Sequence, residues 1–338
     1  MSRASTTPLD GIDLVLADLD GVVYKGAGAI PHAVESLNAA QASVKVGYVT
    51  NNASRTAESV AGHLSELGLT VATDDVVTSP QAAIVLLQQL APAGSTILVI
   101  GGEGLTSVVE AAGFTVTRSA DDAPAAVIQG FAPEVGWKDL AEAAFALKTP
   151  EAEGGIPWVA TNTDWTIPVA RGIAPGNGTL VSAVHTAVGR LPVVAGKPER
   201  AIFDAAIQRF GSTSALFIGD RLDTDIIGAN RAGLRSVHVL TGIDRAKQLL
   251  PADADSRPDF ILGDLRELAQ PYPEQIVKKG LGGVVKHRSG DAEVVLDGSA
   301  VTLTKRGSEV DNIRAGTAAV WGSGKPIYAL DVDAALYS

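Results

Sequence analysis

Four short apolar runs, each followed at once by polar residues, constrain this chain more than any other feature. The runs are rich in Val, Ile and Leu, alternate with helical stretches, and span residues 12–17, 44–49, 191–195 and 215–218. Such runs are typical of neighbouring buried strands in a parallel sheet. Ligands bind outside the carboxyl ends of parallel strands, so we expect the polar residues there to converge on one point. These residues are Asp18, Thr50, Lys197 and Asp220.

Composition narrows the chemistry that this point can support. The 338 residues are 46% apolar, enough for two or three domains with a sizeable core. A formal net charge of −11 without a Lys/Arg cluster argues against a nucleic-acid partner. The chain has no cysteine, which excludes thiol nucleophiles, disulfides and thiolate metal sites. Oxygen ligands and a hard cation remain the expected metal chemistry.

The N-terminal segment gives no targeting signal. Residues 1–10 lack an apolar stretch, and the first hydrophobic run is interrupted by Asp13 and Asp18. We therefore expect neither a signal peptide nor a membrane span, no membrane partner, and a cytoplasmic location.

Spacing predicts three domains. Between Asn52 and Lys197 the chain is several times longer than one βαβ crossover requires, so a folded unit is inserted there. Inside it, residues 95–100, 125–128 and 158–160 are expected strands, and 137–147 an amphipathic helix. We assign residues 9–83 and 186–270 to an α/β core, 84–185 to an α/β insert, and 272–338 to a small β-rich domain.

The C-terminal domain is expected to be built from hairpins. Strands at residues 293–296 and 300–304 flank an Asp297–Gly298 turn, and Gln270–Pro273 is the expected linker. The segments Gly324–Pro326 and Asp331–Asp333 imitate the polar residues of the core, but they come in the wrong order, and we interpret them as hairpin turns.

Asp18 and Asp20 follow a strand end, and Gly21 allows the turn that would face both side chains into a crevice. A carboxylate is already ionised at neutral pH, so Asp18 can attack a phosphomonoester and form an aspartyl-phosphate. Asp20 can then protonate the leaving alcohol and later deprotonate water. An isolated pair of this kind is as often a solvated turn, and only the other three segments favour catalysis.

An anion that attacks a phosphate needs a divalent cation to offset the charge. Asp220 is the expected second carboxylate ligand beside Asp18, and the Asp20 carbonyl completes the set. Mg²⁺ suits such an oxygen-only site. Asp225 is expected to hold the loop or a metal-bound water rather than the ion itself, and Asp223 to face solvent.

Thr50 and Asn51 lie between a strand and a helix expected to start near Ser54, so the Thr50 hydroxyl and nearby backbone N–H groups can reach phosphate oxygens. A plain helix cap is the alternative for them. Lys197 precedes a helix expected at residues 199–210. A lone lysine there is more often solvated, and the whole constellation indicates a phosphate contact.

These segments, DLDGVVYKG, YVTNNAS, GKPE and GDRLDTDIIGA, resemble those of haloacid dehalogenase-like phosphatases. The position of the insert resembles the subgroup with a C2-type cap, which includes phosphoglycolate and glycerol 3-phosphate phosphatases. The resemblance implies a Rossmann-like core, Mg²⁺ at Asp18, Asp20 and Asp220, and nucleophile and acid/base roles for Asp18 and Asp20. The phosphate contacts it implies are Thr50, Asn51, Asn52 and Lys197.

Two further parts carry weaker implications. The cap segment VATNTDWTIPVARG is similar to the family's, with Thr163 where proline is usual, and suggests specificity contacts at Asn162, Asp164 and Arg171. The layout of the tail resembles actinobacterial glycerol 3-phosphate phosphatases that carry an acetyltransferase-like segment. About 60 residues are few for a complete acetyltransferase, so we expect a structural or regulatory tail.

The sequence thus predicts a Mg²⁺-dependent phosphomonoesterase that acts on a small phosphorylated metabolite, with glycerol 3-phosphate or phosphoglycolate as leading candidates. A nucleotide or phosphoprotein phosphatase is one alternative, and a non-enzymatic metabolite sensor is another. The oligomeric state stays open, with a homo-oligomer as one option.

Overall fold

The computed structural model describes residues 6–169 and 171–337. Two compact units divide the chain, Met1–Val46 with Ser214–Ser338, and Gly47–Thr213. The first unit is discontinuous in sequence, whereas the second is one continuous stretch. The three expected domain ranges stay a prediction.

The first unit contains a parallel sheet that ends at the acidic residues. Strand β1 (Leu14–Ala17) pairs with β13 (Ala215–Gly219), which pairs with β14 (Arg235–Val239), and this strand pairs with β15 (Phe260–Leu262). All four residues of β1 and all five of β13 are buried, as expected for strands covered on both faces. The shorter elements of this part are β2 (Tyr24–Lys25), β3 (Gly28–Ala29), α1 (Ala33–Ala40), α8 (Ile227–Ala232) and α9 (Ala246–Leu249).

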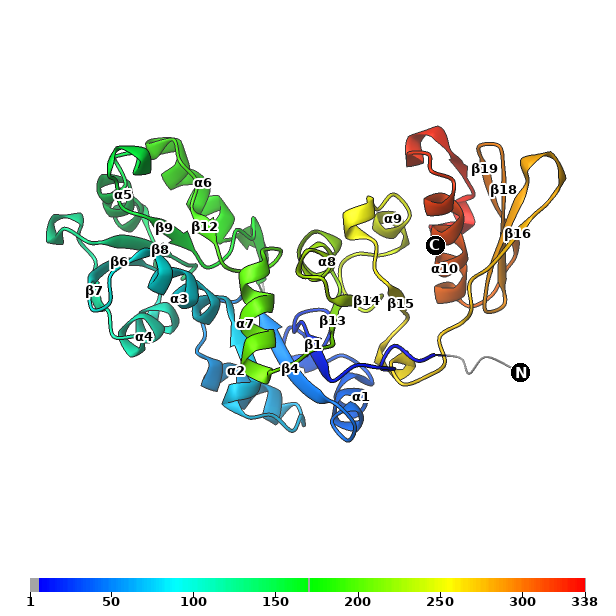
Figure 1. The fold of residues 1–338 in the computed structure, drawn as a ribbon, viewed down its shortest axis with the longest axis horizontal. Helices are drawn as coiled ribbons and strands as arrows, with labels where there is room; N and C mark the ends of the chain where they lie inside the picture. Colours follow the sequence, from blue (N-terminus) through cyan, green and yellow to red (C-terminus); the bar gives the residue numbers. More distant parts are fainter. Residues whose placement is uncertain (1–5, 170, 338) are drawn as a thin grey trace. The chain divides into compact units, whose positions relative to one another are not determined.

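The C-terminal part of the same unit is a sheet with one long helix. Its strands follow the order β16 (Ile276–Lys279), β17 (Val285–Ser289), β18 (Ala292–Asp297), β19 (Ala300–Lys305) and β20 (Asp331–Val332). The expected hairpin at Asp297–Gly298 is confirmed, with Gly298 at φ 59°. Helix α10 (Glu309–Gly322) packs against β17, β18 and β19 (Figure 1).

Helix α10 corrects the expectation of a purely strand-built tail. Its N-cap Ser308 accepts a hydrogen bond from the Asp311 N–H, and Glu309 and Asp311 suit the positive end of the helix dipole. The hairpin interpretation was wrong for Asp331–Asp333, whereas the turn expected at Gly324 is confirmed. Gly324 follows the end of α10 with φ 66°, and Asp331–Val332 forms a short strand parallel to β19.

The second unit holds the strand that ends at Thr50 and the inserted sheet. Strand β4 (Lys45–Thr50) pairs in parallel with β5 (Val76–Thr78). A five-stranded sheet follows the order β12 (Val193–Val194), β9 (Trp158–Ala160), β8 (Ala126–Gln129), β6 (Thr96–Ile100) and β7 (Thr115–Thr117). A hairpin, β10 (Thr166–Val169) with β11 (Gly172–Pro175), lies between β9 and the next helix. The helices are α2 (Ala57–Glu66), α3 (Ser79–Leu90), α4 (Glu103–Ala111), α5 (Trp137–Ala146), α6 (Asn177–Val188) and α7 (Arg200–Phe210).

The run at residues 191–195 was assigned to the wrong sheet. We expected it beside the strand of Asp18, but β12 pairs with β9 in the five-stranded sheet of the second unit. Leu191 and Val193 are 69% and 47% exposed, so this run is an edge strand rather than a buried one. The apolar composition of the run did not distinguish a strand at the edge of a sheet from a strand at its centre.

Most expected elements of the insert are confirmed. The strands expected at residues 95–100, 125–128 and 158–160 are β6, β8 and β9, and the expected helix at 137–147 is α5. Among the residues that the structure describes, no helix combines the length and apolarity needed to cross a bilayer.

Candidate active site

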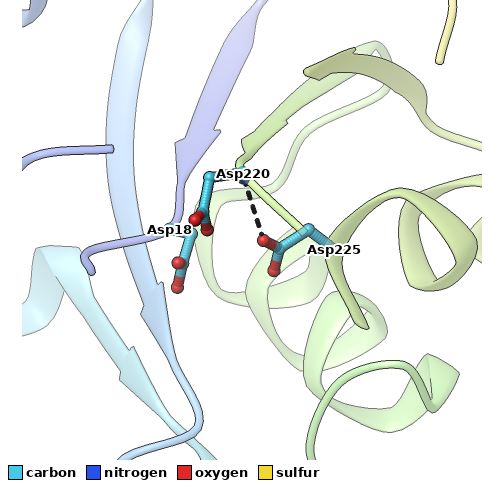
Figure 2. A group of neighbouring side chains, drawn as sticks. All are labelled: Asp18, Asp220 and Asp225. Atoms are coloured by element: carbon cyan, nitrogen blue, oxygen red, sulfur yellow. Dashed lines mark hydrogen bonds between the residues drawn. The ribbon is translucent and has the colours of Figure 1, made fainter. Parts of the chain in front are cut away.

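Three buried carboxylates gather at the carboxyl ends of β1 and β13. Asp18, Asp220 and Asp225 each offer an oxygen, and these oxygens lie within 4.8 Å of one another. Figure 2 shows Asp18 and Asp220 at adjacent strand ends, with Asp225 on the following turn. Asp18 and Asp220 are 202 residues apart in the sequence, and they lie close together within one unit, as expected.

Gly21 makes the turn after Asp18 and leaves room for Asp220. It adopts φ 82°, a left-handed conformation that glycine tolerates best. A Cβ at this position would lie 2.3 Å from Asp220 Oδ2. The turn confirms the expected role of Gly21 and leaves Asp20 exposed at the surface, two residues beyond the buried Asp18.

Asp220 is held by a loop that the sequence analysis missed. This loop, residues 241–244, follows β14. The Ile243 N–H donates to Asp220 Oδ2 at 2.7 Å, and the Thr241 hydroxyl donates to the Gly21 carbonyl at 2.6 Å. A Cβ on Gly242 would lie 1.9 Å from Asp220 Oδ2. A Thr-Gly pair directly after a strand was the signal that could have identified this loop.

Asp225 fixes the turn that carries Asp220. Its Oδ2 accepts the backbone N–H groups of Asp220 and Arg221, both at 3.1 Å, and the first of these bonds is dashed in Figure 2. Asp223, expected to face solvent, is exposed and forms an ion pair with Arg221 at 2.7 Å. The turn is a π-helix, η4 (Leu222–Ile226).

A second layer supports this turn. The Asp244 carboxylate accepts the Leu222 N–H at 2.7 Å, and burial raises the pKa of that carboxyl group. The ring nitrogen Nε2 of His238 donates to the Asp244 carbonyl at 3.0 Å, which places its proton on Nε2. His238 is fully buried, and desolvation lowers its pKa to about 4. His238 is therefore neutral near pH 7.

The second unit holds the expected phosphate contacts. The Asn51 side chain accepts the Lys197 N–H at 2.8 Å and donates to the Lys197 carbonyl at 3.0 Å. Thr50, Asn51 and Lys197 are all buried. The Lys197 side chain is thus not the ordinary solvated charge of a strand end. Asn51 also donates to Asp164 Oδ1 at 3.1 Å.

Asn52 shapes the loop after Thr50. Its backbone N–H donates to the Thr50 hydroxyl oxygen at 3.1 Å, and its side chain accepts from the Ser54 N–H at 2.9 Å. The helix expected near Ser54 begins only at Ala57, with Thr56 as its N-cap. The local Asn52–Ser54 turn competes with helix formation and explains the delay.

Two of the three cap residues lie beside Asn51, and the third does not. The Asn162 side chain donates to the Asn51 carbonyl at 2.8 Å, and Asp164 accepts from the Asn51 side chain. Arg171 is exposed on the hairpin turn between β10 and β11. The structure therefore brings Asp18 and Asp220 together in one unit, and Asn51, Lys197, Asn162 and Asp164 in the other. The convergence of the two groups stays a prediction.

The acidic cluster fits a hard divalent cation. Three carboxylates at this spacing repel one another in a buried place, and a cation offsets that repulsion. Every donor in the cluster is oxygen, the ligand type of Mg²⁺. Asp18, Asp220 and the nearby Asp20 carbonyl are the residues that would hold it.

Family models match both halves of the sequence. Residues 15–115 match a model described as haloacid dehalogenase-like hydrolase, and residues 194–268 match a second, HAD-hydrolase-like model. Both matched ranges contain segments identified above, at residues 18–26, 48–54, 196–199 and 219–229.

Characterised relatives are phosphatases. D-glycerol 3-phosphate phosphatase from Mycobacterium tuberculosis is 44% identical over 91% of this chain and 86% of its own length. An acid sugar phosphatase from Staphylococcus haemolyticus is 32% identical over 74% of this chain and 92% of its own length.

Solved structures agree. A glycerol phosphate phosphatase from Mycobacterium tuberculosis in complex with magnesium matches with a TM-score of 0.84 at 40% identity and covers 97% of this chain and 95% of its own. A 4-nitrophenylphosphatase from Thermotoga maritima matches with a TM-score of 0.71 at 29% identity, over 78% of this chain and 99% of its own. The first match extends across the C-terminal sheet, whereas the second leaves about a fifth of the chain uncovered.

Proposed function

The chain belongs to the haloacid dehalogenase-like hydrolases, and from this premise we propose that it is a magnesium-dependent phosphatase of glycerol 3-phosphate. It hydrolyses phosphomonoesters of small molecules. The observation that carries the substrate is the 44% identity with D-glycerol 3-phosphate phosphatase over 91% of the chain. The likeness to the acid sugar phosphatase is weaker, at 32% identity over 74% of the chain.

Asp18 is the proposed nucleophile. Its carboxylate oxygen attacks phosphorus, the bond from phosphorus to the glycerol oxygen breaks, and an aspartyl-phosphate forms. Water then attacks that phosphorus, and the Asp18 carboxylate leaves. The strand end and the Gly21 turn support this role, because they fix a buried carboxylate beside Asp220.

Asp20 is the proposed general acid and base. It lies two residues beyond Asp18 and is exposed, so it can exchange a proton with solvent. It protonates the leaving glycerol oxygen in the first step and takes a proton from water in the second. Such transfer contributes about 10² to 10⁴ in rate.

Asp18, the Asp20 carbonyl and Asp220 are the proposed holders of Mg²⁺, and Asp225 supports them through the two N–H groups it accepts. The bound ion supplies charge neutralisation for a nucleophile and a substrate that are both anionic. The Ile243 N–H orients Asp220 for this purpose.

Thr50, Asn51, Asn52 and Lys197 are the proposed phosphate contacts. Lys197 brings a positive charge that is buried rather than solvated, which strengthens its attraction for an anion. The Asn51 side chain bonds the Lys197 backbone on both sides, so Asn51 contributes chiefly by placing Lys197.

Asn162, Asp164 and Arg171 remain the proposed specificity residues. Asn162 and Asp164 bond to Asn51 and would act through the shape of that loop. Arg171 is exposed and can present its guanidinium to a polar leaving group. The cytoplasmic location, the homo-oligomeric state and the three domain ranges also remain proposals.

The test is phosphate release with Mg²⁺ and with EDTA, across glycerol 3-phosphate, phosphoglycolate, a sugar phosphate, a nucleotide and a phosphopeptide. We expect selective, Mg²⁺-dependent turnover of glycerol 3-phosphate that falls by about 10⁴ or more in Asp18→Asn. Preference for another substrate would overturn the substrate proposal. Turnover that survives in Asp18→Asn would overturn the mechanism.

A further inference from the structure

Helix α10 of the C-terminal segment has two buried faces. One face carries Ala315, Ala319 and Val320, which pack into the apolar cluster of strands β18 and β19. Ile313 belongs to a different cluster, formed by residues that follow β13 and β14. The helix therefore contacts the sheet of the tail on one side and the parallel sheet of the same unit on the other.

Ile313 packs into the cluster that contains the π-helical turn of the acidic site. It is 3% exposed, and its cluster includes Leu222 and Ile226, the first and last residues of η4. The other members are Leu240, Ala246, Leu249, Ala252 and Ile261. Asp225 lies inside η4 and bonds the Asp220 N–H, so a shift of η4 changes the positions of both carboxylates.

The conformation of η4 increases its dependence on packing. Each backbone hydrogen bond of a π-helical turn spans five residues rather than the four of an α-helix, and such turns are rare. Here the Ile227 N–H donates to the Leu222 carbonyl. The apolar contacts at the two ends of the turn are therefore a main part of what keeps it in place.

Arg314 fixes α10 against β15. It is 3% exposed, its Nε donates to the Ile261 carbonyl at 2.8 Å, and its guanidinium forms an ion pair with Glu267. The same group lies 4.6 Å from the ring centroid of Tyr272. Burial of an arginine is costly without such partners, so this set specifies one docking position for the helix.

Tyr272 shows that the expected linker is also part of this attachment. Its hydroxyl oxygen accepts the Ile261 N–H at 3.1 Å, and its ring packs edge-on against Phe260 at 4.9 Å. A freely moving linker makes no such contacts. The C-terminal segment thus contacts β15 at two points, through Tyr272 in the linker and through Arg314 on α10.

We propose that α10 positions the acidic turn, with Ile313 as a positioning residue that holds η4 and Arg314 as the residue that seats the helix. The C-terminal segment is then a working part of the metal site. The inference rests on the proposed function only for its effect on turnover, because the packing itself is independent of the reaction.

The experiment compares Ile313→Ala with Val320→Ala. Both variants truncate a residue of α10 that is 3% exposed, but only Ile313 belongs to the cluster of η4. Amide hydrogen exchange of residues 220–226 is measured in EDTA, and Mg²⁺ binding is measured by calorimetry. Denaturant titration checks that the two proteins are compared at similar global stability.

We expect exchange at residues 220–226 to be about 10-fold faster, and Mg²⁺ affinity about 3- to 10-fold weaker, in Ile313→Ala alone. The proposal would be overturned if the two variants had the same exchange rate at residues 220–226 and the same Mg²⁺ affinity. This holds whether both variants match the wild type or both are weakened to the same extent. If Ile313→Ala does not fold, Ile313→Val provides the same comparison with a smaller expected effect. If the wild-type protein had no phosphatase activity, the proposed function would be wrong. The exchange result would still test the packing of Ile313, because that packing does not depend on the reaction.

Discussion

In the first unit, backbone N–H groups donate to the acidic side chains of the candidate site. In the second unit, by contrast, the Asn51 side chain bonds to the backbone of Lys197. The Asp220 carboxylate accepts the Ile243 N–H, and the Asp225 carboxylate accepts the N–H groups of Asp220 and Arg221. In the second unit, the Asn51 side chain makes the bonds to Lys197 and Asp164.

The difference determines which residues each region cannot lose. Peptide donors can approach a carboxylate closely only where side chains are absent, and Gly21, Gly219 and Gly242 supply that space. The Asn51 cluster also needs a glycine, because a Cβ on Gly196 would lie 2.6 Å from Asn51 Oδ1, but its hydrogen bonds to Lys197 and Asp164 all come from one side chain. Both regions should therefore be sensitive to added atoms at these glycines, whereas the Asn51 region should also lose its hydrogen bonds when one side chain is shortened.

Gly242→Ala should give the largest effect. The added Cβ meets Asp220 Oδ2 at 1.9 Å, so Asp220 must move. We expect Mg²⁺-dependent turnover to fall by about 10³, more than the effect of losing a residue that only supports a ligand. Steady-state phosphate release measures it. Gly62→Ala, on α2 with nothing within 4 Å, is the control, and similar losses in both would contradict the comparison.

His238 gives the acidic region a pH-dependent stability. Its folded pKa of about 4 lies below its usual value of 6.5, so the unfolded chain binds the proton more readily. Its contribution is present above pH 6.5 and falls as pH drops towards 4, by about 3 kcal/mol in total. We expect a smaller slope of unfolding free energy against pH in His238→Gln. An unchanged slope in denaturant titrations between pH 4.5 and 7 would exclude this role.

Asn51→Ala should destabilise the second region by about 2 kcal/mol, because it leaves the buried Lys197 N–H and carbonyl without their partner. Phosphate release should also fall, mainly through a higher KM, because Lys197 loses its placement. Chemical denaturation and kinetics measure the two effects. Ser54→Ala removes only a hydroxyl bond to Asn52 and should cost far less; an equal cost would contradict the special place of Asn51.

Asp223→Ala should have the smallest effect. Asp223 is exposed and pairs with Arg221 beside the acidic cluster, but it does not belong to that cluster. We expect a change of stability within about 0.5 kcal/mol and unchanged Mg²⁺ dependence, because exposed ion pairs contribute little. A marked loss of Mg²⁺ affinity in calorimetry would show that the acidic region extends beyond the three buried carboxylates.

The sequence predicted what depends on strand ends. Asp18 and Asp220 were expected together because parallel strands place their carboxyl ends at one edge, and their oxygens do lie in one cluster. Gly21 was expected to allow an immediate turn of the chain after Asp18 and Asp20, and the chain turns there with Gly21 at φ 82°. These expectations needed only local chemistry and the geometry of a sheet.

The sequence did not predict what depends on distant packing. The run at residues 191–195 went to the wrong sheet because its exposure is set by neighbours that the run itself does not reveal. Helix α10 has a weakly periodic sequence, and its two apolar faces become evident only once both partners are known. The loop at residues 241–244 holds Asp220 through a backbone N–H group, and its Thr-Gly pair is only a weak sequence signal of that contact.

The discontinuous first unit has a consequence for synthesis of the protein. Asp18 leaves the ribosome about 200 residues before Asp220, a delay of roughly 10 to 40 s at ordinary rates of translation. The second unit is continuous and is synthesised within that interval, since it ends at Thr213. The nascent chain thus carries Asp18 on an unfinished sheet until the strand of Asp220 arrives, and α10 comes last of all. A chain whose synthesis ended between residues 226 and 308 would contain every proposed catalytic residue and no helix to hold the acidic turn.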